Sequence, residues 1–334
     1  MLDTCTASPA LATPAAVGRR LGNELLEPLH LVAYMSDEPN DALQALGYEG
    51  YWPGYFAARS APLGRVPAEV VDALFYNFAP GEVAACIPAC WDVATPEAAL
   101  EAHRQGCVAA LRRILGDLAD TPEVARAADL AIRAAMNAPM EGRILYAALR
   151  SLPVPDEPLT RLWHAATLLR EHRGNGHVVA LVSEGIDGQE AHVLQALDWG
   201  MAPADYGRLD PLTPAQLDAV VDGLRERGLV DAEGKFTPAG RETRNRIEAL
   251  TDALAAPRTT ACSRTRSTNS PPTSNPWSNA SPQPATSRTR TRRHRRHTTR
   301  GMVCDVGLGV WCWLMALECR CGSRVGGGRG RRRS

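Results

Sequence analysis

The sequence predicts a mainly α-helical protein, with an N-terminal helical domain and a C-terminal winged-helix domain that carries a small β-wing. Three observations carry this prediction. Thr-Pro pairs suit helix starts, with Thr as the N-cap and Pro at the first helical position. Apolar residues recur at helical spacing in Ala-, Leu- and Arg-rich segments. The third observation is a helix, hairpin and helix order between residues 212 and 256. The Thr-Pro pairs begin at Thr13, Thr95, Thr121, Thr213 and Thr237.

In the N-terminal half the first helix is expected from Thr13-Pro14, with Val17, Leu21, Leu25 and Leu29 on one face and a bend at Pro28. Aromatic residues gather between residues 48 and 78, where we expect the N-terminal core. Further helices are predicted over residues 40–47, from residue 68 toward residue 78, and over 97–115, 123–137 and 146–152.

The stretch from Leu162 to His177 predicts a helix that ends in a polar turn. Gly174 suits the residue after a helix C-terminus, and Asn175-Gly176 suits a turn. Two helices, over residues 177–184 and 189–197, are predicted to follow. This stretch holds three histidines beside arginines and a glutamate, which makes it the candidate site.

The C-terminal half continues with a helix from Thr213, whose cap Gln216 reinforces in the capping-box position. Residues 229–230 and 235–236 then predict a strand, turn and strand, and Thr237 begins a last helix. This order is typical of a winged helix.

Several motifs carry a resemblance to known proteins. The segment from Leu217 to Arg241 resembles the half-wing of MarR-type bacterial winged-helix regulators. The motifs EPLHLVAY, GYFAARSAPLG, FYNF and LWHAATLLREHRGNGHVVALV make residues 16–256 similar to an actinobacterial family of uncharacterised, SalK-like proteins that contain a winged-helix module. The resemblance implies a fold, and it transfers no activity.

Composition divides the chain. Residues 1–256 hold 21 Lys and Arg against 35 Asp and Glu, a net charge of −14, whereas residues 257–334 hold 16 against 2, a net charge of +14. We therefore predict a disordered leader over 1–12, a helical domain over 13–152, a Pro-rich linker over 153–158 and a winged-helix domain over 159–256. Residues 257–334 are predicted to be a disordered basic tail, and by hypothesis a frameshift product.

The candidate ligand-binding residues are His164, Arg170, Glu171, His172, Arg173 and His177 from the stretch between Leu162 and His177, with His30 and Arg59 from the first half. Histidines at a helix end could converge on an anion, with an arginine as clamp. In the structural alternative, cations simply neutralise the helix C-terminus and His30 pairs with Tyr34 in the core. No zinc-ligand spacing is completed, so we expect no metal site and no cofactor, and no catalytic residue is assigned.

Charge and hydropathy limit the partners. No membrane segment or signal peptide is predicted, and a cytoplasmic location is the simplest expectation. The acidic body and an acidic candidate recognition helix disfavour DNA, because phosphate contacts supply most non-specific affinity. We predict a ligand-sensing or regulatory winged-helix protein. A transcriptional regulator is one form of this prediction, and a second copy of the chain, in a homodimer, is a candidate partner. The alternative is a small-molecule-binding protein or enzyme of secondary metabolism with a His- and Arg-lined interdomain site.

Overall fold

A computed structural model describes residues 26–256, so the predicted leader, the helix start at Thr13 and the basic tail lie outside the described residues. Within this range the protein is mainly helical. Its elements are α2 (Glu27–Met35), α3 (Asp37–Ala45), α4 (Trp52–Ser60), η3 (Ala61–Leu63), α5 (Ala68–Phe75), α6 (Cys90–Val93), α7 (Pro96–Leu115), η4 (Gly116–Asp120), α8 (Pro122–Met136), α9 (Ile144–Arg150), α10 (Pro158–Ser183), α11 (Gly188–Asp198), η5 (Pro203–Asp205), α12 (Pro214–Glu226) and α13 (Pro238–Ala255). None of these helices is both long enough and apolar enough to cross a bilayer.

Three of the Thr-Pro starts cap their helices as predicted. The Thr95 side chain accepts from the Ala98 N–H, Thr237 accepts from Gly240, and Thr213 forms the full capping box with Gln216. At Thr121 the helix also begins at the following proline. The Thr121 hydroxyl donates to the Leu118 carbonyl instead, so Thr121 gives no side-chain cap.

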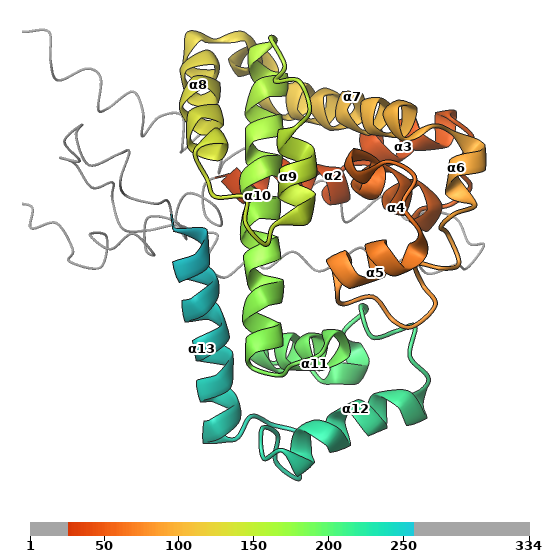
Figure 1. Ribbon diagram of the computed structural model, residues 1–334, viewed down its shortest axis with the longest axis vertical. Coiled ribbons are helices and arrows are strands. Elements are labelled where there is room, and N and C mark those ends of the chain that lie inside the picture. The colour runs from red at the N-terminus through yellow and green to blue at the C-terminus, as the bar shows by residue number, and fades with distance from the viewer. Residues whose placement is uncertain (1–25, 257–334) are drawn as a thin grey trace, which may run out of the picture.

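Buried apolar residues form two clusters. The first runs from Leu26 to Leu168 and includes the aromatic residues Tyr48, Phe56, Phe75 and Phe78, as the sequence predicts for the N-terminal core. The second runs from Ala180 to Ile247. Helix α10 supplies buried residues to both clusters, and Figure 1 shows it running from α7 and α8 down to α11. The predicted division into two domains at residues 153–158 stays a prediction.

The predicted end of the His-rich helix at Gly174 is wrong, and so is the separate helix over 177–184. Helix α10 continues through Gly174, Asn175 and Gly176 to Ser183. The Asn175 Oδ1 accepts from the Tyr146 N–H at 3.4 Å, and a Cβ on Gly176 would lie 3.2 Å from the Leu254 Cβ. Each glycine costs a helix about 1 kcal/mol, but burial against α9 and α13 offsets that cost.

The C-terminal module consists of α11, α12 and α13 (Figure 1). The connection between α11 and α12 contains η5. The predicted β-wing is not formed, because the described residues contain no strand. Only an isolated antiparallel bridge joins Val230 to Phe236, with Gly234 in the left-handed turn at φ 75°. The returning arm is too short for a ladder because Thr237 caps α13 directly after Phe236.

The loop after α5 holds the C-terminal module against the first cluster. Tyr76 donates from its hydroxyl to the Ile186 carbonyl at 2.5 Å, and the Gln189 amide donates to the Phe78 carbonyl at 3.0 Å. The His192 Nε2 lies 2.8 Å from the Asn77 carbonyl oxygen. At Gly188 a Cβ would lie 2.1 Å from the Tyr76 carbonyl oxygen, so the start of α11 touches this loop backbone to backbone.

We therefore predict that Gly188→Ala destabilises the protein by about 1–3 kcal/mol, because the added methyl forces the loop and α11 apart. Gly223→Ala is the matched control, since nothing lies within 4 Å of its Cβ position and the change stabilises a helix interior by about 0.5–1 kcal/mol. Urea unfolding of both variants measures the difference. Equal stability of the two variants would contradict the close packing of α11 on the loop.

Candidate functional site

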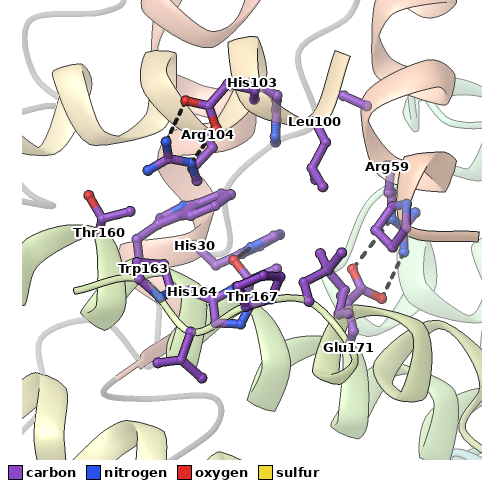
Figure 2. A pocket seen from close by; sticks show the side chains of 18 of the residues that line it. His30, Arg59, Leu100, His103, Arg104, Thr160, Trp163, His164, Thr167 and Glu171 are labelled. Atoms are coloured by element: carbon purple, nitrogen blue, oxygen red, sulfur yellow. Dashed lines mark hydrogen bonds and ion pairs between the residues drawn. The ribbon is translucent and has the colours of Figure 1, made fainter. Parts of the chain in front are cut away.

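A cavity of about 510 Å³ lies inside the first cluster, alongside the first half of α10. Thr160, Trp163, His164, Thr167 and Glu171 line it (Figure 2). Thr160, His164, Thr167 and Glu171 follow one another at intervals of three or four residues, which places them along one face of the helix. A volume of this size suits a small organic molecule. The cavity is therefore built on the stretch that the sequence singles out, but on its N-terminal part.

The other walls come from α2, α4, η3, α7, α9 and the connection that follows α9. Helix α2 contributes His30 and Tyr34, α4 contributes Tyr55 and Arg59, and α9 contributes Leu145 and Leu149. The remaining lining residues on α7 and in the predicted linker are Glu97, Leu100, Glu101, His103, Arg104, Pro153, Val154, Pro155, Asp156 and Glu157. The Pro-rich stretch thus forms one wall of the cavity, and the cavity lies within residues 30–171 rather than between the clusters.

His30 is held by hydrogen bonds on both ring nitrogens. Its Nδ1 lies 3.1 Å from the Thr167 hydroxyl and its Nε2 lies 3.0 Å from the Tyr34 hydroxyl. Its ring also stacks on Trp163, with 6.5 Å between centroids. Burial lowers the pKa of His30 well below its usual range, with a further contribution from Arg170, so the ring is neutral at pH 7. The expected His30–Tyr34 pair is present, and it lines the cavity.

A buried ion pair closes another side of the cavity (Figure 2). The Arg59 Nη2 lies 3.3 Å from Glu171 Oε2, and the Arg170 Nη1 lies 2.8 Å from Glu171 Oε1. Burial acts to raise the pKa of Glu171, but Arg170 and Arg59 outweigh it and hold this pKa at about 2. Arg59 also donates to the Tyr55 hydroxyl at 2.8 Å and lies 4.0 Å from the Phe75 ring centroid.

Of the eight candidate residues, His30, Arg59, His164 and Glu171 line the cavity. Arg170 lies outside the lining and bonds Glu171. The remaining three face other elements. The ring of His172 packs edge-on against Tyr146 at 5.0 Å, Arg173 pairs with Glu248 and Asp252 on α13, and the His177 Nδ1 lies 2.9 Å from the Thr251 hydroxyl.

Helix geometry separates His172 from His164. A helix advances about 100° per residue, so residues eight apart differ by about 80° in direction, and His172 faces Tyr146 of α9. Both arginines proposed as an anion clamp, Arg170 and Arg173, already have carboxylate partners. Each candidate arginine is therefore engaged within the protein.

The sequence interpretation missed His103, Trp163 and Thr167 as lining residues. The signal was available in the spacing of Thr160, His164, Thr167 and Glu171 along one helix face. His103 carried no local signal, because it enters the cavity from α7 and meets Trp163 edge-on at 5.9 Å. Burial lowers the pKa of both His103 and His164 to about 4.

The described residues contain no group of three or more His, Cys, Asp or Glu side chains arranged to hold a metal ion. The cavity lining is instead a mixture of apolar groups, neutral imidazoles and paired charges, with the exposed carboxylates of Glu97 and Asp156 at its edge. Arg104 donates to Glu101 through Nε at 2.8 Å, which pairs the second arginine of the lining. Such a lining binds and orients a molecule through shape and hydrogen bonds.

The C-terminal module presents an acidic surface. Asp218, Asp222 and Glu226 lie four residues apart on α12 and all three are exposed. Of the basic residues there, Arg225 pairs with Asp222 and Arg227 with Glu190 at 2.8 Å. This arrangement gives α12 no basic face.

Comparison with known proteins adds one finding. A model of a helix-turn-helix family matches residues 19–283. The chain belongs to this helix-turn-helix family. No curated protein and no solved structure matches the chain. The match covers every described residue and continues past residue 257, while the proposed origin of the tail stays a prediction.

We predict that acid destabilises the protein between pH 6.5 and about 4. Burial lowers the pKa of His164 and His172 to about 4, that of His192 to about 3, and that of His30 well below its usual range. The unfolded chain binds protons below pH 6.5 that the folded chain does not, so the free energy of unfolding decreases as the pH falls from 6.5 toward 4. The loss is about 1.4 kcal/mol per pH unit for each histidine. Urea unfolding at pH 7.5, 6 and 5 checks this, and equal midpoints would contradict it.

We also predict that Glu171→Gln destabilises the protein by about 3–5 kcal/mol, because Arg59 and Arg170 lose their buried counter-charge. Glu184→Gln is the control. It breaks a surface pair with Arg246, which is worth about 0–1 kcal/mol. Thermal and urea unfolding compare the variants, and a loss at Glu171 no greater than at Glu184 would show that the buried pair is not stabilising.

Proposed function

We propose that this helix-turn-helix protein senses a small molecule, which the cavity beside α10 binds. One observation carries the proposal. The helix that provides the cavity face at residues 160–171 continues without interruption to pack against α13 of the C-terminal module, where we place the helix-turn-helix. A bound molecule therefore contacts the element on which the module rests.

The regulatory reading follows from the family and from the module. Helix-turn-helix proteins commonly act on DNA through a recognition helix, although a fold alone does not establish that function. Here the exposed carboxylates of α12 repel phosphate. We therefore propose ligand sensing as the primary function and make DNA binding an outcome of the test. We also propose that the chain is related to the actinobacterial SalK-like proteins that its motifs resemble.

The enzyme alternative rests on the same cavity. His30 is a neutral imidazole hydrogen-bonded to Tyr34 and Thr167, and a neutral imidazole is able to accept a proton. Against it, both ring nitrogens of His30 are already engaged within the protein. The same experiment separates the two functions, because an enzyme converts the bound molecule and a sensor releases it unchanged.

The test begins with a thermal-shift screen of small molecules on the full chain. We expect Leu100→Trp to abolish the shift given by the molecules found, because the larger side chain fills the cavity from α7 without removing a polar group. Leu130→Trp is the control, since Leu130 is half exposed on α8 and lies outside the lining. Retention of the shift in Leu100→Trp would show that the molecules bind elsewhere.

The second arm measures the response of the module. Selection of DNA from a random pool at low salt, with and without the molecule, shows whether binding alters DNA affinity. A ligand-dependent change supports a transcriptional regulator, whereas no retention in either state removes the DNA-binding form of the proposal. Mass spectrometry of the recovered molecule shows conversion if the protein is an enzyme.

A further inference from the structure

We propose that the cavity beside α10 binds an organic cation, with an apolar or aromatic body inside the cavity and a protonated amine at its mouth. The inference rests on the function proposed above and names the class of molecule that is sensed. Three features of the described residues support it: the charge balance of the lining, two carboxylates at the mouth, and the aromatic walls.

The lining of the cavity carries more negative than positive charge. It contains two arginines and five carboxylates, which are Glu97, Glu101, Asp156, Glu157 and Glu171. Burial lowers the pKa of each of its three histidines, so these rings add no charge at pH 7. The N-termini of α7 and α10 begin at the same residues, and each offsets about half a unit of charge. The lining therefore keeps a net charge of about −2.

Both arginines of the lining are already engaged by carboxylates (Figure 2). The Arg59 Nη2 lies 3.3 Å from Glu171 Oε2, and the Arg104 Nε donates to Glu101 at 2.8 Å. An anionic ligand would have to displace one of these carboxylates to gain a counter-charge. At Arg59 that displacement would leave the buried Glu171 with a weaker counter-charge, which is costly. The arginines therefore do not favour an anion.

Two carboxylates of the lining, Glu97 and Asp156, have no ion pair within residues 26–256. Both residues are exposed, so they lie where the cavity opens to solvent. The pKa of Glu97 lies below its ordinary value, because its own backbone N–H and Thr95 hydrogen-bond the carboxylate and Arg65 lies nearby, so it is ionised at pH 7. An amine at the mouth is attracted by these charges and keeps part of its hydration, which avoids the cost of burying a charge.

The walls of the cavity are aromatic and apolar. Tyr34, Tyr55 and Trp163 line it from α2, α4 and α10, and Leu145 and Leu149 line it from α9. Aromatic side chains favour flat, apolar partners, and the faces of their rings also attract cations. The walls thus suit the hydrocarbon body of the ligand and favour a positive charge on it, whereas an anion gains no such attraction.

The experiment compares three probes that share a biphenyl body, by calorimetry on the full chain at pH 7. They are para-phenylbenzylammonium, para-phenylbenzyl alcohol and para-phenylbenzoate, which carry a positive, a neutral and a negative group. We expect the ammonium to bind most tightly, the alcohol about three- to tenfold more weakly, and the carboxylate more weakly still. Binding of the alcohol or the carboxylate as tight as that of the ammonium, or no binding of any probe, overturns the inference.

Two substitutions made together, Glu97→Gln and Asp156→Asn, test the carboxylates at the mouth. They remove both charges and keep the size of the side chains, so the ammonium should bind about three- to tenfold more weakly and the alcohol as before. The matched control combines Asp218→Asn with Glu226→Gln on α12, which removes the same charge from exposed residues outside the lining. An equal loss of ammonium affinity in both double variants, or no loss in the first, overturns the role of the two carboxylates.

Salt concentration gives a second measure of the same attraction. Between about 0.01 M and about 0.15 M salt, the affinity for the ammonium should fall, because salt screens exposed charges, while the affinity for the alcohol should stay constant. The fall should be smaller in the double variant at Glu97 and Asp156. The same salt dependence for the ammonium and the alcohol would contradict an electrostatic contribution from the mouth.

The outcome is separable from that of the proposed function. Leu100→Trp is the reference for every probe, and binding that this variant retains is assigned outside the cavity. If the alcohol or the carboxylate binds best and Leu100→Trp abolishes its binding, the cavity is a ligand site and only the ligand class is wrong. If Leu100→Trp leaves the binding of every probe unchanged, the cavity is not the binding site and both proposals fail.

Discussion

The continuity of α10 through Gly174, Asn175 and Gly176 is the constraint on which the arrangement of the protein depends. A helix of 26 residues extends about 39 Å, long enough to serve both apolar clusters. Because it does not break, its first half presents one face to the cavity and its second half lies against α13. Gly176 leaves out a side chain where the helix faces α13, because a Cβ there would lie 3.2 Å from the Leu254 Cβ.

A buried charge sits near the middle of this helix, and its neighbours explain the character of the cavity. Glu171 is 2% exposed, and an unpaired carboxylate at such a position would be very costly. Arg170 from the same helix and Arg59 from α4 meet it from two sides. The arginines therefore stabilise the protein's own carboxylate, and they are not free to clamp a ligand anion. The histidines around them stay neutral because burial disfavours their charged form.

The sequence was most informative where local chemistry decides the structure. The caps at Thr95, Thr213 and Thr237 form as predicted, because a side chain within four residues satisfies an open N–H group. The helical class and the helix-turn-helix character followed from the same patterns, and the family comparison supports both.

The sequence failed where distant contacts outweigh local preference. Gly174 and the Asn175-Gly176 pair favour a turn in isolation, yet burial against α9 and α13 keeps them helical. That error placed His177 beside His172 across a turn, although the continuous helix directs His177 toward Thr251 of α13. His172 was grouped with His164 because residues eight apart were treated as one helix face, although they differ by about 80°. His103 could not be found from the sequence, because only the packing of α7 on α10 brings it to Trp163.

The cavity and the C-terminal module are joined by a second set of contacts besides α10. Arg59 lines the cavity, and its guanidinium lies 4.0 Å from the Phe75 ring centroid. The ring centroids of Phe75 and Phe78 are 6.0 Å apart. Phe78 in turn lies 4.4 Å below the Arg208 guanidinium, and its carbonyl accepts from Gln189 of α11.

The residues in this path are buried or half-buried, and a close-packed interior transmits small displacements because it has few voids to absorb them. Under the proposed function, a molecule that shifts Arg59 acts on α11 through the rings of Phe75 and Phe78. Helix α10 carries the displacement to α13. The module is thus held by α10, which lines the cavity, and by the loop after α5, which contacts the cavity lining through Arg59 and Phe75. A ligand that favours one arrangement of these elements would shift the arrangement of the module.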